Sequence, residues 1–259
     1  MKKVLGLILA IAMIVACVCS FAACSGKETL QVYTNAGFAP FEYVNDQGEV
    51  VGVDIDVMNY IGKELGYKVI INDIDFDNIL NEVSKNPLAV GAAGMSKKAS
   101  RDEVALASKV YATSVQYVIA PNGAFAADAV VTTEQILAYA DKIGVQKGTT
   151  GADLIAGAIE DAGNNPDDII TEYANAIVAS QDIGTAACKA VIIDELPAKA
   201  ISGANSNLSC WKIDAEAESY VLYFNKEATE LVEKVNALLD KMIADGTIAQ
   251  YIVNHSSGK

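Results

Sequence analysis

The sequence predicts an α/β protein with mostly parallel sheets, organised as two lobes. Short apolar stretches typical of strands alternate with segments of helical periodicity along the chain, which is the pattern of βα units. The series restarts after Pro121-Asn122-Gly123, which indicates a second lobe. The polar segments 34–38, 94–101 and 148–151, together with Asp194, each follow a predicted strand, where sites form in such folds.

The first series of elements covers residues 30–93. Apolar and polar residues alternate from Leu30 to Tyr33, which predicts a strand. A helix ending at Gly66 is then predicted from the helical spacing of Val57, Met58, Ile61 and Leu65. A buried strand, a second helix and a small-residue strand follow at residues 69–71, 76–83 and 89–93.

The second series begins with a long predicted strand at residues 111–120. Thr132 and Gln135 have the spacing of a capping box, so a helix begins there. Gly148-Thr149-Thr150-Gly151 is a turn into another helix, and further strands are predicted at 143–145, 169–170, 191–193, 211–213 and 220–224. The last helix ends near Gly246 and has one apolar face, formed by Leu231, Val232, Val235, Leu238, Leu239, Met242 and Ile243.

The N-terminus has the features of an export signal. Two lysines precede an apolar run at residues 4–18, and small residues follow, so residues 1–23 are predicted to be a signal peptide. Ala-Ala-Cys resembles a bacterial lipobox, although Phe21 stands where Leu is usual; this implies lipid, palmitate included, on Cys24. Residues 24–29 are then a tether. The alternative is an ordinary secretory signal cut near Ala23.

Charge and the remaining special residues exclude several classes of function. The formal net charge is −14, or −16 without Lys2 and Lys3, so binding to nucleic acid is not expected. No cofactor is expected and no metal site is predicted, because the only histidine, His255, lies in a tail predicted to fray. Cys188 and Cys210 remain in an exported protein, where a disulfide is permitted; their spacing leaves the pairing open.

The segment Gly94-Met-Ser-Lys-Lys-Ala-Ser-Arg101 is the strongest local candidate for a binding site. Gly94 allows close approach to the backbone, Ser96 adds a hydroxyl and an N–H, and Arg101 supplies a planar fork of donors. These groups suit a carboxylate. The alternative is a surface arginine at the start of a helix.

Six segments in order resemble the polar amino-acid-binding proteins of ABC importers. They are residues 35–43, 51–56, 75–77, 93–96 with Arg101, 144–151 and 191–194. The resemblance implies a two-lobed periplasmic-binding-protein fold of type II, with two hinge crossings near Tyr111–Gln116 and Ala217–Leu222. One lobe would hold residues 30–112 and 221–259, and the other residues 113–220. Ala89, Lys189 and Pro87 depart from the family pattern at strand entries.

The same resemblance implies the roles of the binding residues. Arg101 would hold the α-carboxylate of a free amino acid, with N–H or hydroxyl groups of Ser96 and Thr150. Asp194 and the Gly94 carbonyl would accept from the α-ammonium. Phe38 and Phe76 would sandwich the side chain, and Asn35 stands where cation-binding members often have Asp, which favours a neutral or polar ligand. The alternatives are core aromatics for the two phenylalanines and helix caps for Asp194 and Thr150.

The resemblance thus implies a binding protein and not an enzyme. It would be a monomer, anchored by lipid to the cell membrane, facing the exterior or the periplasm, and would deliver its ligand to an ABC permease. Two alternatives stay open. One is an enzyme on the same fold, similar to cyclohexadienyl dehydratase, with Glu42 or Glu195 as the candidate acid. The other is an amino-acid-sensing or adhesion lipoprotein.

Overall fold

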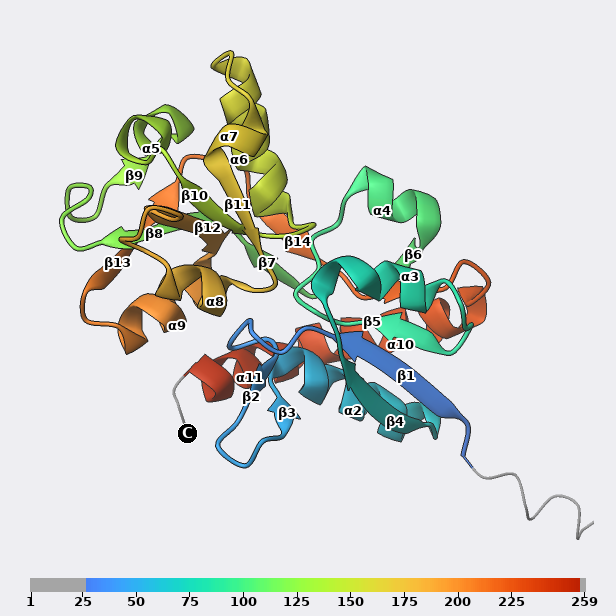
Figure 1. Ribbon diagram of the computed structural model, residues 1–259. Coiled ribbons are helices and arrows are strands. Elements are labelled where there is room, and N and C mark those ends of the chain that lie inside the picture. The colour runs from blue at the N-terminus through green and yellow to red at the C-terminus, as the bar shows by residue number, and fades with distance from the viewer. Residues whose placement is uncertain (1–26, 257–259) are drawn as a thin grey trace, which may run out of the picture.

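The structure, a computed structural model, describes residues 27–256 (Figure 1). The signal peptide and the lipid site at Cys24 lie outside the described residues. The predicted tether overlaps the fold at its end, because strand β1 (Thr29–Thr34) begins at Thr29. Among the described residues, no helix combines the length and the apolar sequence needed to cross a bilayer.

The first lobe is built on a five-stranded sheet in the order β4-β1-β5-β15-β6. Side chains alternate across β1, so Val32 packs towards helix α2 and Tyr33 towards helix α3. Helices α10 and α11 pack beside α2 (Figure 1). The bounds are β4 (Lys68–Asp73), β5 (Ala89–Gly91), β6 (Leu106–Ala107), β15 (Tyr223–Phe224), α2 (Val53–Leu65), α3 (Ile79–Val83), α4 (Ala99–Val104), α10 (Thr229–Ala244) and α11 (Thr247–Ser256), with a small hairpin of β2 (Tyr43–Val44) and β3 (Val50–Val51) and a short 3₁₀ turn at Phe76–Asn78.

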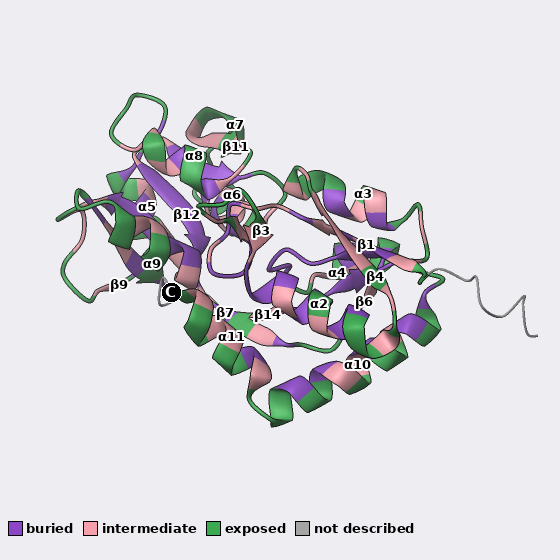
Figure 2. Cartoon of the chain, turned by 90° about the horizontal axis from the view of Figure 1, so that it is seen from below, coloured by how far each residue is buried: buried purple, intermediate pink, exposed green. Residues whose placement is uncertain are grey.

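The second lobe is built on a six-stranded sheet in the order β11-β10-β12-β8-β13-β9. Helices α5 and α6 cover one face, and α8 and α9 cover the other (Figure 1). Figure 2 shows β12 buried at the centre of this lobe. The bounds are β8 (Gln116–Pro121), β9 (Val130–Val131), β10 (Ile143–Gln146), β11 (Ile170–Tyr173), β12 (Ala190–Asp194), β13 (Leu208–Ile213), α5 (Thr133–Tyr139), α6 (Thr150–Asp161), α7 (Pro166–Ile169), α8 (Ala176–Gln181) and α9 (Glu195–Ala204).

A two-stranded antiparallel ribbon joins the two sheets. It pairs β7 (Ala112–Ser114) with β14 (Glu218–Tyr220), and both strands fall in the ranges predicted for the crossings. The ribbon splits the long strand that we predicted at 111–120 into β7 and β8. It likewise splits 220–224 into the end of β14 and β15. The lobe boundaries at 112/113 and 220/221 remain predictions.

The sheets are mixed but mostly parallel, as expected, because one strand in each sheet runs against all the others. Strands β4, β1 and β5 are parallel in the first lobe, and β11, β10 and β12 are parallel in the second, where β13 and β9 also form a parallel pair. The strand that follows each crossing, β8 or β15, is antiparallel to both of its neighbours. The physical reason is that a strand entered directly from the ribbon has no crossover helix to return the chain to the same direction.

The C-terminal segment is more ordered and its apolar face is narrower than the sequence suggested. Leu231, Val235, Leu239 and Met242 are buried, but Ile243 is 46% exposed. The histidine is not in a frayed tail. His255 lies in α11, where Asp56 Oδ2 is 2.9 Å from Nε2 and the Tyr43 hydroxyl is 3.1 Å from Nδ1.

The two cysteines in the described part of the chain are free thiols. Val191 of β12 and Cys210 of β13 pair with the same residue, Ile119, from opposite sides. Two strand spacings, about 9–10 Å, therefore separate these strands. Cys188 is three residues before Val191 in the chain, which places it still further from Cys210. A disulfide needs Cα atoms within about 7 Å, so the disulfide that the sequence left open does not form in this fold.

Candidate functional site

A cavity between the lobes brings together all eight residues that were predicted to bind the ligand. It has about 320 Å³ of empty volume. Its walls are formed by Asn35, Phe38, Phe76, Gly94, Ser96, Arg101, Thr150 and Asp194, with four residues that the sequence did not single out as binding residues, Glu42, Ala93, Gln146 and Thr149. Their meeting is a fact of the structure; their roles towards a ligand stay predictions.

Arg101 is the only arginine of the chain, and it is 7% exposed. The alternative of a surface arginine is therefore wrong. One guanidinium nitrogen donates to the Ser96 carbonyl at 2.7 Å, and another crosses the cleft to the Gly148 carbonyl at 3.0 Å. The guanidinium carbon lies 5.3 Å from the Phe76 ring centroid. Burial lowers the pKa of Arg101, and the charges of nearby acidic groups raise it. The guanidinium stays protonated, because arginine is effectively always charged in proteins.

Asp194 places a carboxyl group on the same cavity. It ends β12 and is 7% exposed. It stands at the N-cap position of α9 but makes no side-chain capping bond, so the helix-cap alternative does not account for it. The Tyr220 hydroxyl donates to it at 2.7 Å. Burial, followed by the charge of Glu218, raises the pKa of Asp194 to about 7. A cationic ligand group would favour its ionised form.

Gly94 is required by a close approach of two segments. Its φ is +52°, and a Cβ there would lie 2.6 Å from the Phe38 ring. Its N–H donates to Asp54 Oδ2 at 2.8 Å, and the Tyr111 hydroxyl holds the other oxygen of Asp54 at 2.6 Å. Asp54 therefore fixes the loop from behind. The sequence placed it in a family motif without giving it this role.

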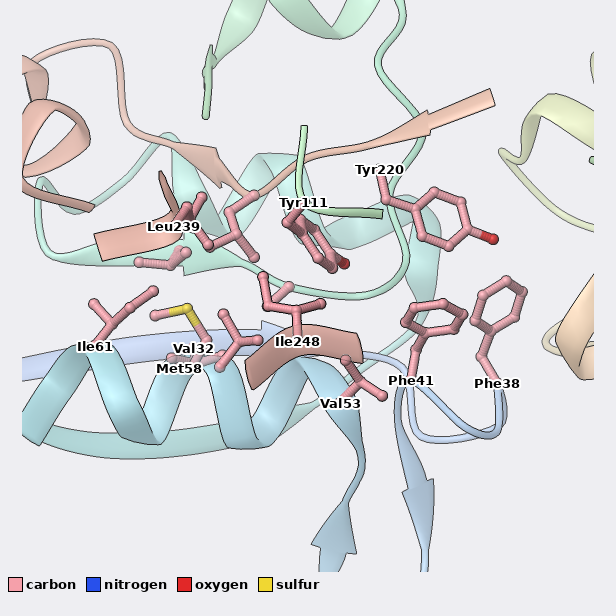
Figure 3. Close-up of a cluster of buried hydrophobic side chains, with 14 of the residues drawn as sticks. Val32, Phe38, Phe41, Val53, Met58, Ile61, Tyr111, Tyr220, Leu239 and Ile248 are labelled. Atoms are coloured by element: carbon pink, nitrogen blue, oxygen red, sulfur yellow. The ribbon is translucent and has the colours of Figure 1, made fainter. Parts of the chain in front are cut away.

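Phe38 serves both the core and the cavity. Its ring centroid is 6.0 Å from that of Phe41 and 6.4 Å from that of Tyr220 (Figure 3). It is buried in the main core cluster and also lines the cavity. Phe38 is therefore a core aromatic that also lines the cavity, and its contact with a ligand side chain stays a prediction. Phe76 is only half-buried and faces Arg101.

Two amides meet across the cleft. Gln146 Nε2 donates to Asn35 Oδ1 at 2.9 Å, and Asn35 Nδ2 donates to the Ile74 carbonyl at 2.7 Å. Asn35 therefore contributes to contact between the lobes as well as to the cavity wall. Gln146 is the last residue of β10, and its place at a strand end is the signal that could have identified it.

The α6 helix is capped by Thr149, not by Thr150. The Thr149 hydroxyl accepts from the Ala152 N–H at 3.2 Å. Thr150 is the first residue of the helix, so its own N–H has no acceptor within the helix and is available to an anion. The Thr150 hydroxyl is engaged with Glu218 at 2.8 Å. The helix-cap alternative for Thr150 is thus wrong by one residue.

Glu42 is a buried acid, and its Oε2 atom has no hydrogen-bond partner among the described residues. It is 1% exposed and Oε2 makes no hydrogen bond there. Burial, then the charges of Asp54 and Asp194, raise the pKa of Glu42 well above its usual range. Such a carboxyl can donate a hydrogen bond while protonated, or ionise beside a cation.

The second acid considered for an enzymatic role does not line this cavity. Glu195 forms an ion pair with Lys199 at 2.5 Å and accepts from the Tyr117 hydroxyl at 3.3 Å. No group of three or more histidine, cysteine or carboxylate side chains in residues 27–256 is arranged to hold a metal ion. The cavity therefore offers a buried cation, a buried acid and a second, unpaired acid, which together suit a zwitterion.

Known proteins resemble this chain over most of its length. A model of the bacterial extracellular solute-binding proteins, family 3, matches residues 30–255. The arginine-binding extracellular protein ArtP of Bacillus subtilis is 26% identical over 228 residues, which are 86% of this chain and 84% of that protein.

Solved structures agree with that match. The substrate-binding protein AbpA of an amino acid ABC transporter from Streptococcus pneumoniae, bound to L-arginine, has a TM-score of 0.78 at 26% identity, covering 89% of this chain and 95% of its own. An ancestral arginine-binding protein bound to glutamine has a TM-score of 0.77 at 28% identity, covering 89% and 98%. These similarities extend over both lobes.

Proposed function

This chain belongs to the bacterial extracellular solute-binding proteins of family 3, and on that premise we propose that it captures a free α-amino acid between its lobes for an ABC importer. The observation that carries the proposal is the meeting of Arg101 and Asp194, both buried, on the wall of one cavity. A zwitterion supplies both counter-charges at once. No chemical step is part of the proposal.

The α-carboxylate is bound by Arg101, whose planar fork can donate to it in place of the backbone carbonyls to which it now donates. The free N–H at the start of α6 supports this end of the ligand. Asp194 accepts from the α-ammonium. Each such charged hydrogen bond contributes about 1.5–3 kcal/mol, which in sum allows micromolar or tighter binding after ordering costs.

The ligand side chain is proposed to be polar. The amides of Asn35 and Gln146 favour a neutral hydrogen-bonding group, as in glutamine. A second candidate is a cationic side chain, and the observation that favours it is the unpartnered carboxyl oxygen of Glu42. The similar proteins support both candidates, because ArtP is named as arginine-binding, AbpA is bound to L-arginine, and the ancestral arginine-binding protein is bound to glutamine.

The number of protons released on binding distinguishes the neutral from the cationic class of ligand side chain. Neutral glutamine requires ionisation of Asp194 alone, whereas arginine would also ionise Glu42, whose pKa is raised. Calorimetry at one pH in buffers of different ionisation enthalpy measures this number. Greater proton release with L-arginine than with L-glutamine, together with tighter binding, would select the cationic class.

We also propose that lipid on Cys24 anchors the chain at the outer face of the cell membrane, where it acts as a monomer and passes the amino acid to a permease. The support is the signal-like N-terminus and the transport context of the similar proteins. Loss of amino-acid uptake on deletion of the gene would favour transport over sensing or adhesion. Unchanged uptake would contradict it.

The central test is calorimetry of ligand-stripped mature protein against the common amino acids. Arg101→Ala is expected to weaken binding by a hundredfold or more, about 3 kcal/mol, because a buried bidentate charge pair is lost. Arg101→Lys keeps the charge without the fork and should recover only part of the affinity.

Lys97→Ala, which removes a neighbouring exposed cation, is the matched control and should bind as the wild type does. Full affinity in Arg101→Ala, or no binding of any amino acid by the wild type, would contradict the proposal.

A further inference from the structure

The carboxylate of Glu218 receives hydrogen bonds from three side chains at the edge of the cleft. It lies on strand β14 of the ribbon between the lobes. The Thr150 hydroxyl donates to it at 2.8 Å and Gln116 Nε2 at 3.0 Å. The Ser96 hydroxyl also donates to it. None of the ion pairs found in residues 27–256 includes Glu218, so its partners there are neutral donors.

Two of these donors come from opposite lobes and meet at one oxygen. Ser96 precedes α4 in the first lobe, and the next N–H, that of Lys97, donates to the Ser219 carbonyl of the ribbon at 2.8 Å. Thr150 begins α6 in the second lobe. Both hydroxyls donate to Glu218 Oε2. A single carboxylate oxygen thus ties the two walls of the cavity together.

The direction of these bonds determines what the cavity wall presents. An ionised carboxylate only accepts, and a hydroxyl has one proton. The protons of Ser96 and Thr150 therefore point to Glu218 and not into the cavity. The donors available to the α-carboxylate of a ligand are therefore Arg101 and backbone N–H groups. We expected either the N–H or the hydroxyl groups of Ser96 and Thr150 to bind it, and the N–H groups are now favoured.

We propose that Glu218 is a positioning residue that holds Ser96 and Thr150 together across the cleft and so slows release of the bound amino acid. The inference rests on the proposed function. Glu218 acts on the closed arrangement of the lobes, because its bond to Thr150 exists only while α6 lies against the ribbon. Encounter with the ligand does not require that bond.

The test is the Glu218→Gln variant, with association and dissociation rates measured by stopped flow. The probe is L-arginine or L-glutamine, whichever the wild type binds more tightly. The amide has one accepting oxygen for three donors, so we expect dissociation to be about tenfold faster, ~1.4 kcal/mol, with an unchanged association rate. Glu216→Gln removes the same charge two residues away, at an exposed position, and should leave both rates unchanged.

A double-mutant cycle separates positioning from a general structural effect. Thr150→Val removes only the hydroxyl, and Glu218→Gln should accelerate dissociation less in that background than in the wild type. Additive effects, or an unchanged dissociation rate in Glu218→Gln, would overturn the inference while leaving the proposed function intact. If Glu218→Gln does not fold, the single variants Ser96→Ala and Thr150→Val must each speed dissociation. A wild type that binds no amino acid would contradict the proposed function itself.

Discussion

At the scale of single residues, the site contains buried ionisable groups that have no oppositely charged partner within the described chain. Arg101 donates to two carbonyls and Asp194 accepts from a tyrosine, yet neither has an opposite charge in hydrogen-bond contact. Burying such groups is costly unless they are paired. The raised pKa of Asp194 is the measurable sign of that cost. A zwitterionic ligand would remove it.

Affinity for the amino acid is predicted to fall as the pH is lowered through about 7. Burial raises the pKa of Asp194 to about 7, so below that pH the carboxyl is protonated and must lose its proton to hold an ammonium. The linkage allows at most about tenfold weaker binding per pH unit for this one proton. Calorimetric titrations between pH 5 and about 8 measure the slope.

Asp194→Asn is the control for this prediction. It should bind more weakly at neutral pH and lose most of the slope. Asp54, with a pKa of about 6, lies behind the site and is left unchanged in that variant. If Asp194→Asn keeps the pH profile of the wild type, the titrating group is another acid.

At the scale of elements, those with local signals were predicted well. The capping box of α5 is present in full: the Thr132 hydroxyl accepts from the Gln135 N–H at 3.3 Å, and the Gln135 side chain accepts from the Thr132 N–H at 2.9 Å. Elements that depend on distant contacts were predicted less well. The end of α11 is docked by the contacts of His255 with Asp56 and Tyr43, and by Ile248, Tyr251 and Ile252, which pack on the core.

Removal of the α5 cap is predicted to destabilise the protein without changing the cavity. Thr132→Ala leaves one helix-end N–H without its acceptor, which costs about 1 kcal/mol. Urea unfolding measures this as a lower midpoint with an unchanged slope. Thr133→Ala, one residue later, loses no capping bond and serves as the control. Equal loss in both variants would mean that the cap contributes nothing.

At the scale of the whole molecule, several polar contacts cross from one lobe to the other. Gln146 contacts Asn35, Lys147 pairs with Asp77 at 2.8 Å, and Arg101 reaches the Gly148 carbonyl. All of them would break if the lobes rotated apart about the ribbon of β7 and β14. The exposed ion pair among them, Lys147 with Asp77, contributes little to the free energy of closure. We infer that the bound amino acid supplies most of the energy of closure.

A cross-link between the lobes is predicted to trap them in the closed arrangement. The Cβ of a residue at position 37 would lie 3.1 Å from that of Asn175, close to the separation in disulfides, about 3.5–4.5 Å. Oxidised Gly37→Cys/Asn175→Cys should show no change in radius of gyration on addition of ligand. It should also block ligand exchange until it is reduced.

The wild type is the reference for this experiment and should become more compact with ligand. The reduced double variant is the second control, since it has the same sequence without the cross-link. Free ligand exchange in the oxidised form would show that lobe opening is not the route by which ligand enters.

Sequence alone was enough to predict the alternation of strands and helices, the point where the second series begins, and eight of the twelve residues that line the cavity. The alternation and the restart follow from apolar periodicity and from helix and turn signals, which are local. The eight cavity residues follow from the resemblance to a known family. Local signals also placed Arg101 after a buried strand.

Which distant groups face one another follows from the tertiary structure and not from the sequence pattern. The antiparallel strands β8 and β15, the free state of Cys188 and the burial of Glu42 all depend on contacts between segments that are far apart in the chain. So does the meeting of Ser96, Thr150 and Glu218 at one oxygen. The physical reason is that hydrogen bonds and desolvation depend on distance in space, which residue spacing along the chain does not specify.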